Sequence, residues 1–211
     1  MRSSSIFLLL TIVIISMFSS CSNSETKKAT ETSSADSTAV VIPDAKDFRD
    51  TINNQSTDLY VLQNSKGMKA AITNYGGRLV SLLVPDKNGK LTDVVVGFKS
   101  VKDYANSTEP YFGATIGRYG NRIAKGKFTL DGNQYTLFTN NGPNTLHGGK
   151  NGYQAVVWNA KQINDSTLEL TYLSKDGDEG FPGNLNVKVI YRLTNDNELN
   201  LTTRQRLIRK R

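Results

Sequence analysis

The chain has 211 residues, of which 37% are hydrophobic, and it carries a formal net charge of +7 at pH 7. This length is sufficient for one domain with a substantial core. Because the sequence contains one cysteine and one histidine, it excludes an intrachain disulfide and argues against a zinc site.

Residues 1 to 21 are predicted to be a signal peptide that is not part of the fold. Arg2 provides a positive start, and the apolar run from 6 to 18 is too short to span a bilayer. Small residues then precede Cys21, a pattern that resembles a bacterial lipoprotein signal in which this cysteine is lipidated. We therefore expect an exported lipoprotein, anchored through Cys21 to a membrane of the bacterial cell envelope. The alternative is an ordinary secretory signal in which Cys21 has no role.

Residues 22 to 46 are predicted to be a flexible tether. They are rich in Ser, Thr, Ala, Glu and Lys and contain no aromatic residue. Such a segment buries too little apolar surface to offset the entropy of ordering its chain.

Residues 47 to 203 have the pattern of a β domain, in which short apolar or alternating runs are separated by turn clusters. Asp131-Gly132 is the strongest hairpin signal, because this pair readily takes the positive φ angles of a tight turn. Residues 100 to 106 are the one weak helical candidate. The pattern predicts an all-β fold, an antiparallel sandwich or barrel. Predicted strands cover residues 58–63, 69–73, 78–84, 91–98, 127–130, 134–138, 158–162, 167–173, 185–193 and 198–203.

Residues 204 to 211 (RQRLIRKR) form a basic tail with five positive charges and no acid, which accounts for most of the net charge of +7. A basic tail can contact nucleic acid or anionic lipid. Export argues against nucleic acid as a partner. We interpret the tail as foreign to the fold, the end of a truncated or frame-shifted reading frame.

Two glycine-punctuated segments carry the candidate site: residues 117 to 128 (GRYGNRIAKGKF) and 144 to 149 (NTLHGG). They contain Arg118, Arg122, Asn121 and the only histidine, His147. Glycine permits close backbone approach, so polar side chains can be aimed into a cleft. Arginine donates from a fixed fork, asparagine donates and accepts, and histidine does either. These side chains suit a neutral, hydroxyl-rich ligand.

Other interpretations of these residues remain open. The arginines could lie on a solvated edge or form salt bridges with Asp93, Asp103 or Glu109. Residues 176 to 180 (DGDEG) hint at a calcium loop, but they lack its spaced ligands and terminal glutamate, so we interpret them as a polar loop between strands. The sequence has no nucleophile–histidine–carboxylate signature and no phosphate-binding glycine loop.

Four stretches, 74–98, 111–137, 144–149 and 176–185, resemble the aldose 1-epimerase family, also called galactose mutarotases, in family order. The resemblance implies a galactose mutarotase-like supersandwich, an antiparallel β-sandwich with a sugar cleft. It implies acid–base interconversion of the α and β anomers of hexoses such as galactose and glucose, with no cofactor or metal required.

The resemblance also implies roles for individual residues. Asn121 and Arg122 would donate hydrogen bonds to sugar hydroxyls, and His147 would contact the sugar near its reacting end. Arg118 and Gly117 resemble scaffold positions.

The sequence departs from the family in the groups that move protons. The resemblance implies a second histidine as catalytic acid and a glutamate near the C-terminus as base, in proteins roughly twice as long as this domain. This chain has one histidine, which already matches the binding position, and the family-like sequence stops at residue 203. We therefore expect the domain at 47–203 to be partial, to contain no catalytic residue and to be inactive, and to be a monomer if it folds. The alternatives are a catalytically dead carbohydrate-binding lipoprotein and a non-functional gene fragment.

Overall fold

The structure is a computed structural model that describes residues 40 to 208. The predicted signal peptide at 1–21, the lipidation site Cys21 and most of the predicted tether at 22–46 lie outside the described residues. Within residues 40 to 208, no helix has the length and apolar character needed to cross a membrane.

The described residues form short strands with few helical turns. The one α-helix is α1 (Val101–Asn106), and the 3-10 turns are η1 (Ala45–Phe48), η2 (Ala124–Gly126), η3 (Tyr153–Ala155) and η4 (Asp178–Gly180). The strands are β1 (Asp50–Ile52), β2 (Gln55–Thr57), β3 (Leu59–Gln63), β4 (Lys69–Thr73), β5 (Arg78–Pro85), β6 (Leu91–Asp93), β7 (Arg122–Ile123), β8 (Lys127–Leu130), β9 (Asn133–Thr136), β10 (Thr145–Leu146), β11 (Asn159–Asn164), β12 (Thr167–Ser174), β13 (Asn184–Leu193) and β14 (Leu199–Ile208).

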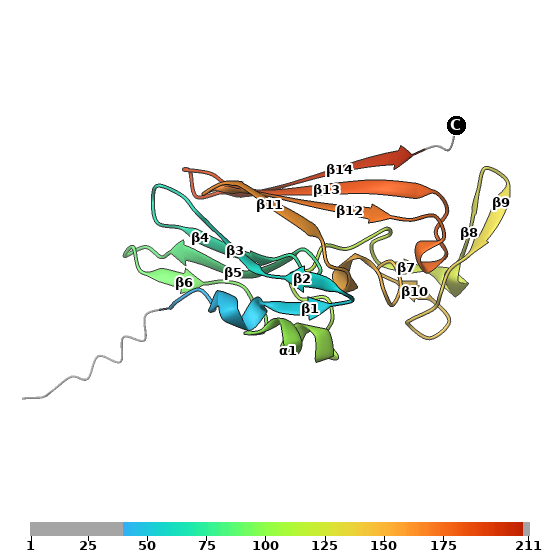
Figure 1. Ribbon diagram of the computed structural model, residues 1–211, viewed down its shortest axis with the longest axis horizontal. Helices are drawn as coiled ribbons and strands as arrows, with labels where there is room; N and C mark the ends of the chain where they lie inside the picture. The colour runs from blue at the N-terminus through green and yellow to red at the C-terminus, as the bar shows by residue number, and fades with distance from the viewer. Residues whose placement is uncertain (1–39, 209–211) are drawn as a thin grey trace, which may run out of the picture. The chain divides into compact units, whose positions relative to one another are not determined.

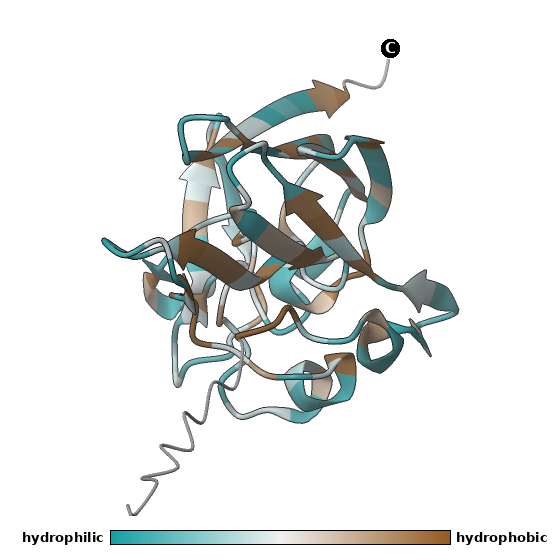
Figure 2. Ribbon diagram, turned by 90° about the vertical axis from the view of Figure 1, so that its left-hand side faces the viewer, coloured by the Kyte–Doolittle hydropathy of each residue, from teal (hydrophilic) through white to brown (hydrophobic). Residues whose placement is uncertain are grey.

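Two four-stranded antiparallel sheets, β3-β4-β5-β6 and β11-β12-β13-β14, contain most of the strand residues in this part of the chain (Figure 1). Three two-stranded ribbons, β1-β2, β7-β10 and β8-β9, accompany them. Every pairing is antiparallel, so the predicted all-β class is confirmed for residues 40 to 208. In Figure 2, hydrophobic residues concentrate on the strands, while the connecting loops are mainly hydrophilic.

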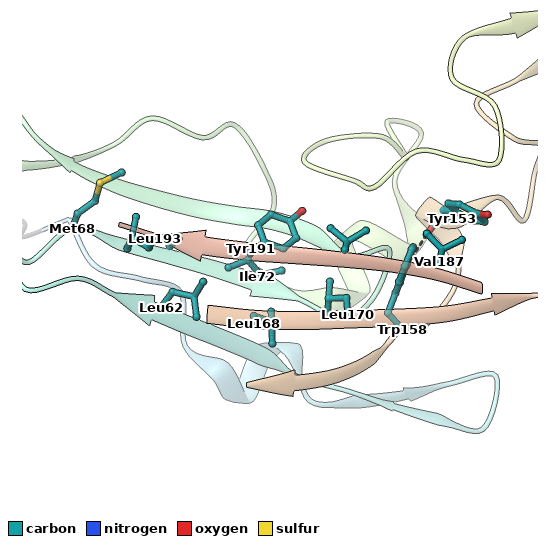
Figure 3. Close-up of a cluster of buried hydrophobic side chains, with 12 residues drawn as sticks. Leu62, Met68, Ile72, Tyr153, Trp158, Leu168, Leu170, Val187, Tyr191 and Leu193 are labelled. Atoms are coloured by element: carbon teal, nitrogen blue, oxygen red, sulfur yellow. Dashed lines mark hydrogen bonds between the residues drawn. The ribbon is translucent and has the colours of Figure 1, made fainter. Parts of the chain in front are cut away.

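The main hydrophobic core lies between the two sheets. Along β13, Val187, Val189 and Tyr191 are buried, while alternate residues are less buried, as the period of two along a strand requires. Leu62 of β3 and Ile72 of β4 belong to the same buried cluster, which Figure 3 shows as side chains gathered between the strands. The alternation predicted for residues 185–193 is therefore confirmed.

Several local predictions agree with the structure. Ser100 accepts a hydrogen bond from the backbone N–H of Asp103 (3.1 Å) and begins α1 where a helix was expected. Asp131 and Gly132 have φ angles of 50° and 80° and join β8 to β9. The strand predicted at 91–98 ends at Asp93, because the Asp93 carboxylate accepts the N–H groups of Leu82 and Val95, both at 3.0 Å, and so competes with the strand ladder.

The prediction that residues 204–211 are foreign to the fold differs from the structure. Strand β14 continues to Ile208 and pairs with β13 over its whole length, with Arg204 opposite Lys188. Like charges placed opposite each other are unfavourable, and most β14 side chains are exposed. The pairing therefore rests on the ladder of backbone hydrogen bonds, which the basic side chains of this segment do not prevent. Residues 209 to 211 lie outside the described range.

We predict that Tyr191→Phe changes how stability responds to alkaline pH. The buried Tyr191 hydroxyl donates to the Gly77 carbonyl (2.9 Å), and burial raises the pKa of this hydroxyl to about 12 from its usual 10.0. Between these two pH values the folded state holds a proton that the unfolded state has lost, so stability falls as pH rises. At neutral pH the variant should lose about 1 kcal/mol, since Thr115 still donates to the same carbonyl.

Urea unfolding at pH 7 and pH 11 provides the measurement. Burial also raises the pKa of Tyr153 and Tyr172, so both proteins should weaken at high pH, and the variant should weaken less. An identical loss of stability in the two proteins between these pH values would contradict the prediction.

Candidate functional site

The two glycine-punctuated segments meet at the ribbon of β7 and β10, where Leu146 pairs with Arg122 (Figure 1). Just beyond this pair, the backbone N–H of His147 donates to the Asn121 carbonyl (2.9 Å). In return, the backbone N–H of Asn121 donates to His147 Nδ1 (3.0 Å). The structure thus brings together the three residues predicted to bind ligand.

This reciprocal pair fixes the orientation and the tautomer of the histidine. Because Nδ1 accepts a hydrogen bond from the backbone N–H of Asn121, the neutral imidazole carries its own proton on Nε2. The edge-on ring of Tyr111 packs against His147 with 4.8 Å between ring centroids. His147 and Asn121 have positive φ angles, 52° and 69°, a conformation that residues other than glycine adopt only where their surroundings enforce it. His147 therefore presents a pre-positioned N–H donor.

Arg122 is held by neutral amides. Its Nε donates to Asn141 Oδ1 (2.9 Å) and its Nη1 donates to Asn121 Oδ1 (3.3 Å). Within residues 40 to 208, neither Arg122 nor Arg118 takes part in an ion pair, so the alternative of salt bridges with Asp93, Asp103 or Glu109 is not observed. The guanidinium of Arg122 is oriented without being neutralised.

Arg118 has a different environment, although it lies four residues from Arg122. Its guanidinium donates to Ser174 Oγ (2.7 Å) and to four backbone carbonyls. The carbonyls belong to Pro182, Ser174, Lys175 and Gly183 at 2.8, 3.0, 2.8 and 2.8 Å. Arg118 therefore ties its segment to the end of β12 and the start of β13, which agrees with the scaffold role expected for it.

The loop after His147 depends on close backbone packing. Gly148 has a φ angle of +87°, and a Cβ atom at this position would overlap the carbonyl group of Gly117. Next to it, the Glu179 carboxylate accepts from the backbone N–H of Lys150 (2.9 Å) and lies against Gly149. The segment at 176–180, interpreted from sequence as a polar loop, thus also braces the histidine loop. The described residues contain no group of three His, Cys, Asp or Glu side chains placed to hold a metal ion.

Sequence reasoning missed several supporting residues. The side-chain amide of Asn140 binds both backbone groups of Leu146. It accepts a hydrogen bond from the Leu146 N–H (2.7 Å) and donates one to the Leu146 carbonyl (3.0 Å). Asn140 also lies 3.4 Å from the Tyr111 hydroxyl, whose pKa is raised by burial. The cluster of asparagines at 140, 141 and 144, just before the histidine, is a turn signal that could have indicated this bracing. Tyr111 and Glu179 had no comparable local signal.

Comparisons with known proteins identify relatives of the chain. A protein-family model described as aldose 1-epimerase matches residues 58–210. Galactose mutarotase of Sus scrofa is 44% identical over 138 residues, which are 65% of this chain and 40% of that protein. Aldose 1-epimerase of Escherichia coli (strain K12) is 36% identical over 167 residues, 79% of this chain and 45% of the relative.

Solved structures confirm the fold. The aldose epimerase homologue of C. elegans superposes with a TM-score of 0.69 at 31% identity, over 72% of this chain and 46% of that one. Galactose 1-epimerase of Lactobacillus acidophilus NCFM gives a TM-score of 0.65 at 27% identity, over 73% and 45% of the two chains. The expected galactose mutarotase-like fold is therefore confirmed. The chain spans less than half the length of these relatives.

The contrasting environments of the two arginines predict that the same substitution lowers stability strongly at one position and hardly at the other. Arg118→Lys should lower the free energy of unfolding by about 2 kcal/mol or more, because an ammonium group cannot reproduce the fork that joins five oxygen atoms. Arg122→Lys is the matched control and should change stability by less than about 0.5 kcal/mol, since Arg122 is exposed. Chemical denaturation measures both, and equal losses in the two variants would refute the assignment of Arg118 as scaffold.

Proposed function

The chain belongs to the aldose 1-epimerase family, and we propose from this premise that Asn121, Arg122 and His147 bind a hexose such as galactose or glucose. The observation that carries the proposal is the reciprocal hydrogen bonding of Asn121 and His147 beside Arg122. An imidazole N–H, a side-chain amide and a guanidinium thus lie close together at the β7-β10 ribbon. Such groups match the vicinal hydroxyls of a sugar, each of which donates and accepts.

The reaction expected of the family moves two protons. A base takes the proton of the anomeric hydroxyl while an acid protonates the ring oxygen, and the ring opens to the aldehyde. Rotation about the bond between C1 and C2, followed by closure with the reverse proton transfers, gives the other anomer. The whole cycle is redox-neutral and consumes no co-reactant, which is consistent with a reaction that needs no cofactor. Each general acid or base typically contributes a factor of about 10² to 10⁴ in rate.

We propose that the 211-residue chain by itself holds the sugar without converting it. Nδ1 of the single histidine is occupied by the Asn121 amide, so His147 acts as a donor that orients the sugar. Glu179, which packs on the histidine loop, already accepts from the backbone of Lys150. The resemblance assigns the catalytic acid to a second histidine, and this chain has one. The proposed activity of the 211 residues is therefore carbohydrate binding.

Calorimetric titration of the full chain with galactose and glucose tests the proposal. We expect binding without turnover, and Arg122→Lys should weaken it by about tenfold, because an ammonium group cannot donate as a planar fork. Arg192→Lys, at an exposed position of β13, serves as the control and should bind like the unmodified chain.

A coupled anomer-interconversion assay completes the test. A rate close to that of full-length relatives would show that this chain has its own proton-transfer pair and would overturn the proposed inactivity. Failure to bind either sugar would overturn the binding proposal and favour the non-functional gene fragment.

We also propose that the chain is exported and anchored through a lipid on Cys21. The sequence pattern around that cysteine supports this proposal. Mass spectrometry of the membrane fraction should find the mature N-terminus acylated at Cys21, and Cys21→Ser should move the protein to the soluble fraction. An unmodified, soluble protein with Cys21 intact would favour the ordinary secretory signal.

A further inference from the structure

Strand β14 lies at one edge of its sheet and pairs there with β13 (Figure 1). This pairing continues without a shift in register from Leu199 to Ile208. The strand at the opposite edge, β11, has a register shift between Gln162 and Asn164, and such irregularities protect an edge from further pairing. The long, regular edge of β14 therefore offers a template on which another strand can add.

Alternate residues of β14 direct their backbone groups away from β13. The N–H of Thr194 donates to the Glu198 carbonyl (2.8 Å) across the turn that joins the two strands. Because bonded and non-bonded pairs alternate along an antiparallel ladder, the N–H and C=O groups of Leu199, Leu201 and Thr203 point outward. In the part of the chain that the structure describes, β14 has no strand partner besides β13.

The two ends of this edge carry opposite charges. Asp196 and Glu198 precede the strand, in the turn after β13. Arg204 and Arg206 lie toward its end. All four side chains are exposed, and none takes part in an ion pair among the described residues. If β14 pairs antiparallel with the same strand of a second copy, the acidic end of each copy meets the basic end of the other.

One register satisfies both pairs of charges. When Leu201 lies opposite Leu201 of the second copy, Arg204 faces Glu198 and Arg206 faces Asp196. The backbone groups that point outward then meet and exchange hydrogen bonds. Leu201, which is 56% exposed, contacts its counterpart and loses apolar surface to water. A register with arginine opposite arginine is unfavourable, so the charges select one register.

We propose that β14 is a dimerisation edge, which pairs antiparallel with β14 of a second copy of the chain. The two-fold axis passes through Leu201 perpendicular to the sheet, so the same face of each sheet continues across the junction. A dimer differs from the monomer expected from the sequence. The proposal is independent of sugar binding, because β14 contributes none of the residues of the candidate sugar site.

Sedimentation equilibrium of the full chain tests the proposal. Every variant carries Cys21→Ser, so that neither a lipid nor a disulfide joins the copies. We expect a concentration-dependent dimer. Arg204→Glu should raise its Kd at least about tenfold, because two carboxylates then lie opposite each other. Glu198→Arg should have the same effect, and the two substitutions together should restore the Kd to within about threefold, because the opposite charges are only exchanged.

Lys87→Glu is the matched control. Lys87 is exposed in the turn between β5 and β6, and its reversal changes the net charge as Arg204→Glu does. This variant should form dimers like the chain with Cys21→Ser alone.

Amide hydrogen exchange provides a readout that needs no charge reversal. The N–H groups of Leu201 and Thr203 should exchange more slowly as the protein concentration rises, because the second copy covers them. The N–H of Thr202 is the internal control, since it points to β13 and should exchange at a rate that is independent of concentration.

Three results would overturn the dimerisation edge. The first is a monomer at protein concentrations up to about 1 mM. The second is a dimer whose Kd Arg204→Glu leaves unchanged, and the third is one that the double reversal does not restore. In the last two cases the copies meet through another surface. None of these results bears on the proposed sugar binding, which calorimetry tests separately.

Discussion

The candidate site depends on the two-way pairing of Asn121 with His147. One bond joins backbone to backbone at 2.9 Å, and the other directs an amide N–H to the imidazole Nδ1 at 3.0 Å. These bonds connect two segments that are separated in the sequence, and they hold both residues at positive φ angles. Loss of the pairing would release the histidine ring and the guanidinium that Asn121 helps to orient. The site is therefore constrained by the backbone conformation of Asn121 and His147, which their two hydrogen bonds enforce. The same bonds fix the tautomer of the His147 ring.

The surrounding residues make this arrangement stiff before any ligand arrives. Asn140 and Glu179 hold the backbone on either side of His147, and the lack of a side chain at Gly148 lets its loop approach Gly117. Groups held in place by such contacts bind with a smaller loss of conformational entropy than mobile ones. The two arginines have different roles. The guanidinium of Arg118 donates to backbone carbonyls and supports the scaffold, whereas the guanidinium of Arg122 contacts neutral amides and keeps its charge available.

The sequence predicted features that depend on local patterns. The alternation along residues 185–193 predicted a strand with one buried face, and Asp131-Gly132 predicted the hairpin of β8 and β9. The family resemblance indicated which side chains belong together at the site. Long-range contacts were beyond this reasoning: Glu179 braces the histidine loop from 29 residues away, and the tail at 204–208 joins β14 because β13 offers it a partner. Neither contact leaves a local trace in composition or periodicity.

The tautomer of the single histidine shows whether Asn121 orients the imidazole ring. A nitrogen-15 NMR spectrum of the imidazole contains signals from one residue, since the chain has one histidine. We expect an unprotonated Nδ1 that accepts a hydrogen bond and a protonated Nε2, whose resonance shifts when galactose is added. A ring protonated on Nδ1, or an Nε2 signal that galactose leaves unchanged, would contradict the claim that Asn121 orients His147 to hold a sugar.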